Sequence, residues 1–332
     1  MEDAGRVLTF LFSQLPLPLV VLLLAVLSAL LTGIGTRRAM LDLDLPPGRW
    51  PVTFAVVAAV ISGLFLWGVL SWQSQSTPEV IPANGWREGR VLYHLSLMIL
   101  LLIVTATDLR SYLILVWCCR IGIGLALLGA VISGQFQLAH VWVDWNAEIP
   151  QLRGPEIPAW LAIHPHWHGL AWSLSGMFCG VILTWLIRWL GSWVLGRNAL
   201  GSGDILLMAM VGAYLGWQPV VVITALAPIL AMGVGVIERL WGNRAVLPYG
   251  PFLALASLVV MSCWKWIWMA EFSLSFESSR NRAAVFAVRR FFGDPLQMLL
   301  IAGGALCLLI VLLGLLRIYK SLPTRKTHQH SE

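Results

Sequence analysis

Apolar residues are gathered into long runs along the chain, and short polar stretches separate these runs. A helix rises about 1.5 Å per residue, so about 20 apolar residues cross the roughly 30 Å hydrocarbon layer of a membrane. The pattern predicts an all-α fold, a polytopic membrane helix bundle with about eight or nine transmembrane helices. The sixth run is too short to span alone, and we expect it to borrow a turn from the segment before it. The nine runs lie at about 8–32, 52–72, 91–109, 121–139, 169–190, 205–217, 220–237, 248–268 and 297–317.

Composition supports a membrane protein and excludes a soluble enzyme. Of the 332 residues, 58% are hydrophobic and 11% are charged, whereas soluble domains are about 45–50% apolar and about 25% charged. The mean hydropathy of +0.80 and the 18 tryptophans agree with this, because indole rings favour membrane interfaces. The net charge of +6 comes without a basic tract in a polar segment, so we expect a lipid bilayer and no nucleic acid as a partner.

Two kinds of metal ligand occur, but their spacing does not suit a metal site. The five cysteines form no CxxC pair, so neither a zinc ribbon nor a redox motif is indicated. His164, His166 and His168 have a spacing that fits no common helix-borne pair, and Pro165 interrupts them. We therefore expect no metal.

The basic residues set the predicted orientation of the helices. If the N-terminus lies outside and nine spans alternate, 13 of the 22 lysines and arginines fall inside and nine outside, in the direction of the positive-inside rule. Two outer segments are then long, 73–90 and 140–168. The second is too polar to span, and we expect it to form a small cap. The stretch 270–296, with four arginines, is expected to form an interfacial amphipathic helix.

Only two of the 16 acidic residues, Asp108 and Asp204, lie in apolar helical surroundings. A carboxylate inside the bilayer costs about 2.5–3.5 kcal/mol, so such residues are usually functional. The simpler alternative for Asp108 is an ion pair with the nearby Arg110. In the predicted orientation Asp108 ends the third span and Asp204 begins the sixth, so both lie at the inner face.

Two carboxyl groups at one membrane depth form a dyad if their helices touch. Like charges a few ångströms apart cannot both ionise, so one acid keeps a proton while the other acts as a base. Such a pair activates a water molecule against an amide carbonyl. We therefore expect an aspartyl protease at the cytoplasmic edge of a membrane. No fixed role is assigned to either acid, because the two protonation steps belong to the pair.

Glycines precede the second aspartate, in the segment Leu200-Gly201-Ser202-Gly203-Asp204. Without Cβ atoms, these glycines allow a tight helix start and the close approach of another backbone, such as a substrate strand. At a helix start, the helix dipole favours the ionised form of an aspartate.

Three blocks of the sequence carry a resemblance to a known family. The first, Thr105–Ile114, has Asp108 followed by Leu-Arg; the second, Gly201–Trp217, has the GxGD pattern and a trailing Leu-Gly-Trp; the third, Leu247–Ala256, contains Pro-Tyr-Gly-Pro. Together they resemble the type IV prepilin leader peptidases, which are GxGD-type intramembrane aspartyl proteases. Their order and spacing agree with that family across roughly residues 91–268.

The resemblance implies an endopeptidase of the bacterial inner membrane. It would cleave the basic leader peptide from type IV prepilins or type II secretion pseudopilins at the cytoplasmic face. Asp108 and Asp204 would be the catalytic pair, with no metal or organic cofactor. The residues expected to support the active site or to bind substrate are Gly201, Gly203, Pro248, Tyr249, Gly250 and Arg110.

The chain also departs from the family pattern. Many members carry two zinc-binding CxxC pairs after the first span, tied to N-methylation, but Thr36–Trp50 contains no cysteine. The resemblance therefore does not extend to methyltransferase activity. A lysine common two positions after the second aspartate is Leu206 here, and the Pro-Asp often found after the first block is Leu115-Val116. Two interpretations of these departures stay open: the protein has a specialised substrate, or it is an inactive descendant of the family.

The expected organisation has three parts. Residues 1–90 hold N-terminal membrane helices and an outer segment; residues 91–268 hold the GxGD protease core with the outer insertion 140–168; residues 269–332 hold an interfacial segment, the last transmembrane helix and a cytoplasmic tail. Two other functions stay open. One is a proton-coupled transporter, because buried acids and broken helices also mark ion pathways. The other is a catalytically inactive assembly factor that resembles a prepilin peptidase. The sequence does not indicate the oligomeric state.

Overall fold

The computed structural model describes residues 14–83, 85–143, 158–195, 200–240, 248–274 and 284–300, two short strands near residue 150, and isolated positions near both ends. In this part of the chain, eight helices of 13 residues or more form a bundle. They are α2 (Leu17–Asp42), α3 (Trp50–Trp72), α4 (Trp86–Ser111), α5 (Val116–Ser133), α7 (Pro165–Leu195), α8 (Ser202–Leu215), α9 (Trp217–Leu240) and α10 (Gly250–Ser262). The smaller elements are β1 (Glu148–Ile149), β2 (Gly154–Pro155), α6 (Ala159–Ile163), α11 (Trp264–Trp268), β3 (Glu271–Leu274), β4 (Ala284–Ala287) and α12 (Val288–Phe291).

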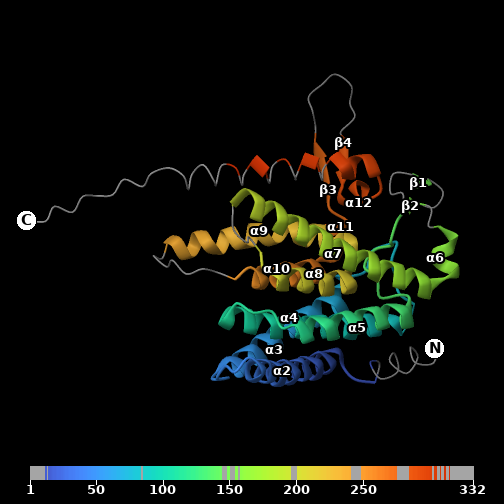
Figure 1. The fold of residues 1–332 in the computed structure, drawn as a ribbon. Coiled ribbons are helices and arrows are strands. Elements are labelled where there is room, and N and C mark those ends of the chain that lie inside the picture. Colours follow the sequence, from blue (N-terminus) through green and yellow to red (C-terminus); the bar gives the residue numbers. More distant parts are fainter. Residues whose placement is uncertain are drawn as a thin grey trace, which may run out of the picture.

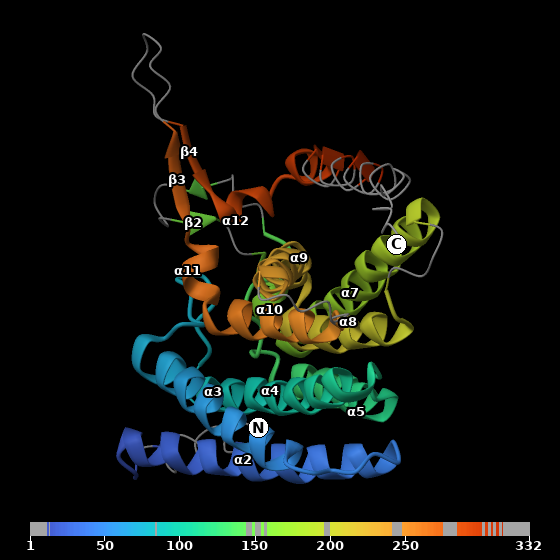
Figure 2. The same ribbon diagram turned by 90° about the vertical axis from the view of Figure 1, so that its left-hand side faces the viewer.

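The long helices lie side by side in stacked layers (Figure 1). Helix α2 lies on one side of the bundle, and α3 leans from it toward α4. The layer of α4 and α5 comes next, then α8 and α10, and α7 and α9 lie beyond (Figure 2). Of the six long apolar helices, α4 is the most enclosed: 72% of its most apolar 18-residue stretch is buried, against 22% for α2. The outward apolar side chains of α2 suit contact with lipid tails, which are as apolar as leucine.

The polytopic helical fold predicted from the sequence is confirmed. Among the described residues, six helices are long and apolar enough to cross a membrane, namely α2, α3, α4, α5, α7 and α9, while α8 and α10 are shorter. Helix α8 begins at Ser202, about a turn before the predicted run, and has 14 residues. The predicted run 297–317 lies mostly outside the described residues.

Helix α2, the first long helix of the described residues, lies further along the chain than the first apolar run. It runs from Leu17 to Asp42 instead of 8–32, and residues 8–11 lie outside the described residues. Pro16 and Pro18 stand at its start, where a missing backbone N–H costs no hydrogen bond. The helix then continues beyond the apolar run, because the helical backbone bonds do not require apolar side chains.

The expectation of an amphipathic helix over 270–296 was wrong. Strands β3 and β4 pair there as an antiparallel ladder, with Glu271 opposite Ala287 and Leu274 opposite Ala284. Among the described residues between 270 and 293, only the four residues of α12 are helical. An ion pair of 3.1 Å joins Arg289 of α12 to Glu271 of β3. Residues 275–283 lie outside the described part. The paired segments are rich in Phe, Val and Leu, which favour strands.

Two tryptophans of neighbouring helices form hydrogen bonds to the backbone of the loop after α5. The indole N–H of Trp217 donates to the carbonyl oxygen of Val141 at 2.7 Å, and that of Trp264 donates to the carbonyl oxygen of Leu138 at 2.8 Å. These bonds lie at the end of the bundle that carries α6 (Figure 1). Of the predicted cap over 140–168, the structure describes the short β1–β2 ladder, α6 and the start of α7 at Pro165.

Helices α7 and α8 touch backbone to backbone along a line of glycines. An added Cβ at Gly176 would overlap the carbonyl oxygen of Gly212, and one at Gly180 would overlap the carbonyl oxygen of Met208. We call this contact, formed by Gly176 and Gly180 of α7 with Met208 and Gly212 of α8, the glycine seam. Small residues allow such close approach in membranes, and the seam fixes the antiparallel register of the two helices.

Replacing Gly176 by alanine should destabilise the protein by about 1–3 kcal/mol, which is the usual cost of overpacking. The added methyl group meets backbone atoms of α8, and these cannot move aside as a side chain can. Thermal unfolding in detergent measures the change. Gly124→Ala is the matched control, because Gly124 of α5 has no heavy atom within 4 Å of an added Cβ. An unchanged melting temperature for Gly176→Ala would contradict the close packing.

Candidate active site

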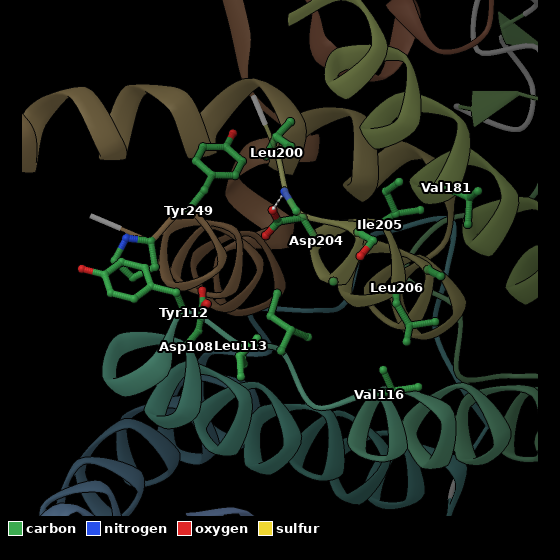
Figure 3. A pocket seen from close by; sticks show the side chains of 16 residues that line it. Asp108, Tyr112, Leu113, Val116, Val181, Leu200, Asp204, Ile205, Leu206 and Tyr249 are labelled. Atoms are coloured by element: carbon green, nitrogen blue, oxygen red, sulfur yellow. Dashed lines mark hydrogen bonds between the residues drawn. The ribbon is translucent and has the colours of Figure 1, made fainter. Parts of the chain in front are cut away.

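A cavity of about 860 Å³ lies where α4 ends and α5, α8 and α10 begin. We call this end of the bundle the site end. Asp108 of α4 and Asp204 of α8 both line the cavity (Figure 3). The two carboxyl groups lie close enough for their charges to interact. The structure thus brings together two acids that lie 96 residues apart in the sequence.

Asp108 lies in the last turn of α4 and is only 4% exposed. Tyr112 ends this helix with a left-handed backbone (φ 58°), and its N–H donates to the Asp108 carbonyl oxygen at 2.9 Å. At the start of α10, Gly250 packs against the acid: an added Cβ would overlap Oδ2 of Asp108 and lie 3.2 Å from its Cγ. The absence of a side chain at Gly250 leaves room for the carboxyl group.

Asp204 lies in the first turn of α8 and is 6% exposed. Its Oδ2 accepts a hydrogen bond of 2.9 Å from the backbone N–H of Gly201, the residue that caps the helix. Gly203 packs against Ile114, whose Cβ would lie 2.7 Å from an added Cβ. The space beside Gly203 is therefore filled by this chain's own loop after α4, and this contact holds the start of α8 near the end of α4.

Most of the residues expected to support the site gather around the cavity. Gly201, Gly203, Pro248 and Tyr249 line it, and Gly250 contacts Asp108 as described above. The two described residues just before α10, Pro248 and Tyr249, thus reach the same cavity as the two acids. In Figure 3, the rings of Tyr249 and Tyr112 lie on the same side of the cavity as the Asp108 carboxyl group.

Arg110 is the one expected residue that the structure places away from the cavity. Its side chain is exposed and it is not among the lining residues. Both Asp108 and Arg110 are described, and the structure contains no ion pair between them. The simple pairing that would neutralise Asp108 is therefore not formed.

Sequence reasoning missed the apolar side of the cavity. Val116 of α5, Val181 of α7 and Leu206 of α8 line it opposite the two acids. Val116 and Leu206 are also positions at which the chain departs from the family pattern. The sequence shows these two residues only as departures from the family pattern. The fold shows that both line the same cavity. Arg188 of α7, whose charge acts on the Asp204 carboxyl group, was missed as well.

Two carboxyl groups in a mostly apolar cavity can exchange protons with a bound substrate or water. The described residues contain no group of three His, Cys, Asp or Glu side chains that could hold a metal ion. His166 bonds instead to the carbonyl oxygen of Val131 at 2.7 Å, and His168 accepts from the N–H of Val141 at 3.3 Å. The two aspartates in one cavity have the side chains that general acid–base catalysis requires.

Comparison with known proteins gives a consistent family. Residues 157–236, which include Asp204, match the model of the Type IV leader peptidase family. A "Prepilin leader peptidase/N-methyltransferase" of Pectobacterium carotovorum subsp. carotovorum is 31% identical over 154 residues, which are 42% of this chain and 52% of the relative. One of Escherichia coli (strain K12) is 27% identical over 169 residues, 47% of this chain and 74% of the relative.

A third relative of the same name, from Aeromonas hydrophila, is 29% identical over 119 residues, 32% of this chain and 41% of the relative. The match spans about half or less of the Pectobacterium and Aeromonas relatives and 74% of the Escherichia coli one. No solved structure matches the chain. The resemblance to the type IV prepilin leader peptidases is confirmed.

Proposed function

We propose that the protein is a membrane-embedded aspartyl endopeptidase that removes the basic leader peptide from type IV prepilins or type II secretion pseudopilins. The observation that carries the proposal is the convergence of Asp108 and Asp204 on one cavity. The similarity to proteins named prepilin leader peptidase supports the choice of substrate.

The proposed reaction uses one proton shared by the two carboxyl groups. The ionised acid takes a proton from a water molecule, whose oxygen attacks the carbonyl carbon of the scissile amide. The protonated acid gives its proton to the carbonyl oxygen, which forms a neutral tetrahedral intermediate. The intermediate collapses when the amide nitrogen receives a proton and leaves as an amine. No metal or organic cofactor takes part in these steps.

We further propose that the site end faces the cytoplasm of a bacterial cell, in its inner membrane. Three arginines, Arg37, Arg38 and Arg49, lie at or near the connection between α2 and α3, and a basic excess favours the cytoplasmic side. Helices α2, α3, α4 and α5 follow each other in alternating direction (Figure 1). The end of α4 therefore shares the side of this arginine-rich connection.

Cysteine labelling tests the orientation. Ser202 is exposed at the site end and Trp160 is 44% exposed in α6 at the opposite end. In a chain without its native cysteines, a membrane-impermeant maleimide added to intact spheroplasts should label Trp160→Cys and spare Ser202→Cys. Lysis should expose Ser202→Cys to the reagent. Labelling of Ser202→Cys in intact spheroplasts would place the site on the wrong side.

Methyl transfer is not part of the proposal, although the relatives' names include it. Seven residues, 43–49, connect α2 to α3. Neither this connection nor the flanking helix ends contain cysteine. Mass spectrometry of the product N-terminus would report a methyl group directly.

Cleavage by the purified protein tests the proposed function. The protein in lipid vesicles is incubated with a full-length prepilin-like subunit from the same cell, and mass spectrometry follows the leader. Release of the leader at a single bond supports the peptidase. Binding of the subunit without cleavage would favour the inactive assembly factor. A proton flux into the vesicles that requires Asp108 and Asp204, without cleavage, would favour the transporter.

A further inference from the structure

The two carboxyl groups of the cavity sit at opposite ends of their helices. Asp108 lies in the last turn of α4, and Asp204 lies in the first turn of α8. The end of a helix carries a partial negative charge and its start a partial positive charge. The helix ends alone therefore favour a negative charge on Asp204 over one on Asp108.

Backbone hydrogen bonds reach both acids, because Gly250 also bonds to the Asp108 carboxyl group, so these bonds alone do not separate the two. The N–H of Gly201 donates to Oδ2 of Asp204 at 2.9 Å, and a bond of this kind is strongest when the acceptor is ionised. Gly201 and Asp204 belong to the same tight helix start, so the donor is fixed before any substrate binds.

A positive charge also stands beside the start of α8. Along the glycine seam, residues four apart on α7 meet residues four apart on α8, because such residues share a helix face. Moving four residues forward on α7 and four back on α8 brings Thr184 level with Asp204. A second move of the same kind brings Arg188 level with Leu200. Arg188 is partly buried, and its charge acts on the Asp204 carboxyl group.

The other ionisable groups around Asp204 do not replace Arg188. Asp108 faces it from α4, and the Tyr249 hydroxyl lies near it from the segment before α10. Arg120 of α5 is exposed and does not line the cavity. Among the described residues that act on Asp204, Arg188 is the cation.

We propose that Arg188 is a positioning residue that holds Asp204 as a carboxylate, so that Asp204 is the general base and Asp108 the general acid. This assignment rests on the proposed peptidase function. Asp204 takes a proton from water while the water oxygen bonds to the carbonyl carbon, and Asp108 gives its proton to the carbonyl oxygen. Asp204 then gives its proton to the amide nitrogen as the C–N bond breaks, and Asp108 regains the proton from the carbonyl oxygen.

The pH dependence of kcat/KM tests the proposal. A base must be ionised, so kcat/KM falls at acidic pH as Asp204 gains a proton. When a neighbouring cation is lost, a carboxylate becomes protonated at a pH that is higher by roughly one unit or more. For Arg188→Gln, the acidic limb should therefore move to higher pH, and kcat/KM on that limb should fall about tenfold. The alkaline limb, set by Asp108, should move less.

Three further variants make the outcome decisive. Arg188→Lys restores the charge and should return the acidic limb to its original pH, whereas Arg120→Gln removes an exposed charge outside the cavity and should leave the profile unchanged. Arg188→Met is a second neutral variant that keeps the apolar stem, for use if the Gln variant does not fold.

An acidic limb that stays in place in a neutral Arg188 variant overturns the proposal. A loss that is equal at every pH and persists in Arg188→Lys also overturns it, since Arg188 would then act through packing alone. A wild-type protein that cleaves no prepilin contradicts the proposed function itself, which is a separate result.

Discussion

Replacing either Asp108 or Asp204 by asparagine should lower leader cleavage by about a thousandfold or more. Positioned acid–base groups typically contribute 10²–10⁴-fold, and in this cavity one pair of groups performs both proton transfers. Asparagine keeps the shape and polarity of aspartate but can act neither as a carboxylate base nor as a carboxylic acid. The measurement is the initial rate of leader release from a prepilin in lipid vesicles.

The control for these variants is Asp42→Asn. Asp42 lies in the last turn of α2 on the same side as the site end, where it pairs with Arg38 at 3.5 Å and is partly exposed. This variant should cleave at the wild-type rate. The double variant Asp108→Asn with Asp204→Asn should be hardly slower than either single variant, because residues that act as a unit are not additive. Normal cleavage by either single variant would refute the proposed protease.

Replacing Gly250 by alanine should lower kcat about a hundredfold while leaving stability nearly unchanged. The added methyl group would overlap the Asp108 Oδ2 atom. A carboxyl group can turn away from such a contact, so the fold tolerates the change, but the acid then leaves its working position. A displacement of about 1 Å at a reacting group can cost 10²-fold in rate.

The matched control for Gly250→Ala is Gly233→Ala. Gly233 lies in α9 and has no heavy atom within 4 Å of an added Cβ. Both variants should unfold near the wild-type temperature, and only Gly250→Ala should lose activity. Wild-type activity in Gly250→Ala would show that the Asp108 carboxyl group has freedom to work elsewhere in the cavity. A large loss of stability would instead mean that the start of α10 is rigid.

The sequence allowed the two acids to be found because charge is rare in the apolar runs. Counting the runs then placed Asp108 and Asp204 at the same membrane depth, and the structure brings both to one cavity. The glycines near Asp204 signalled a close approach, although the neighbour at Gly203 is Ile114 of the same chain. Scarcity and helix alternation are thus strong signals in a membrane chain.

Other parts of the site could not be predicted from the sequence. Arg110 is close to Asp108 in sequence, but side chains two positions apart point to different sides of a helix, and Arg110 is exposed. In the sequence, Arg188 is only a basic residue near the end of an apolar run. Its place near Asp204 could not be predicted, because that place depends on the packing of α7 against α8. The apolar lining was hidden for a different reason: a membrane helix is apolar on most faces, so its pattern does not reveal which face meets a cavity.

The brevity of α8 and α10 bears on how the proposed enzyme obtains its co-substrate, water. With 14 and 13 residues, they rise about 21 and 20 Å, some 10 Å less than the roughly 30 Å hydrocarbon layer. The cavity lies at the starts of these two helices. Under the proposed orientation, the missing length would let cytoplasmic water reach the two acids, and the scissile bond would enter the cavity from the same side.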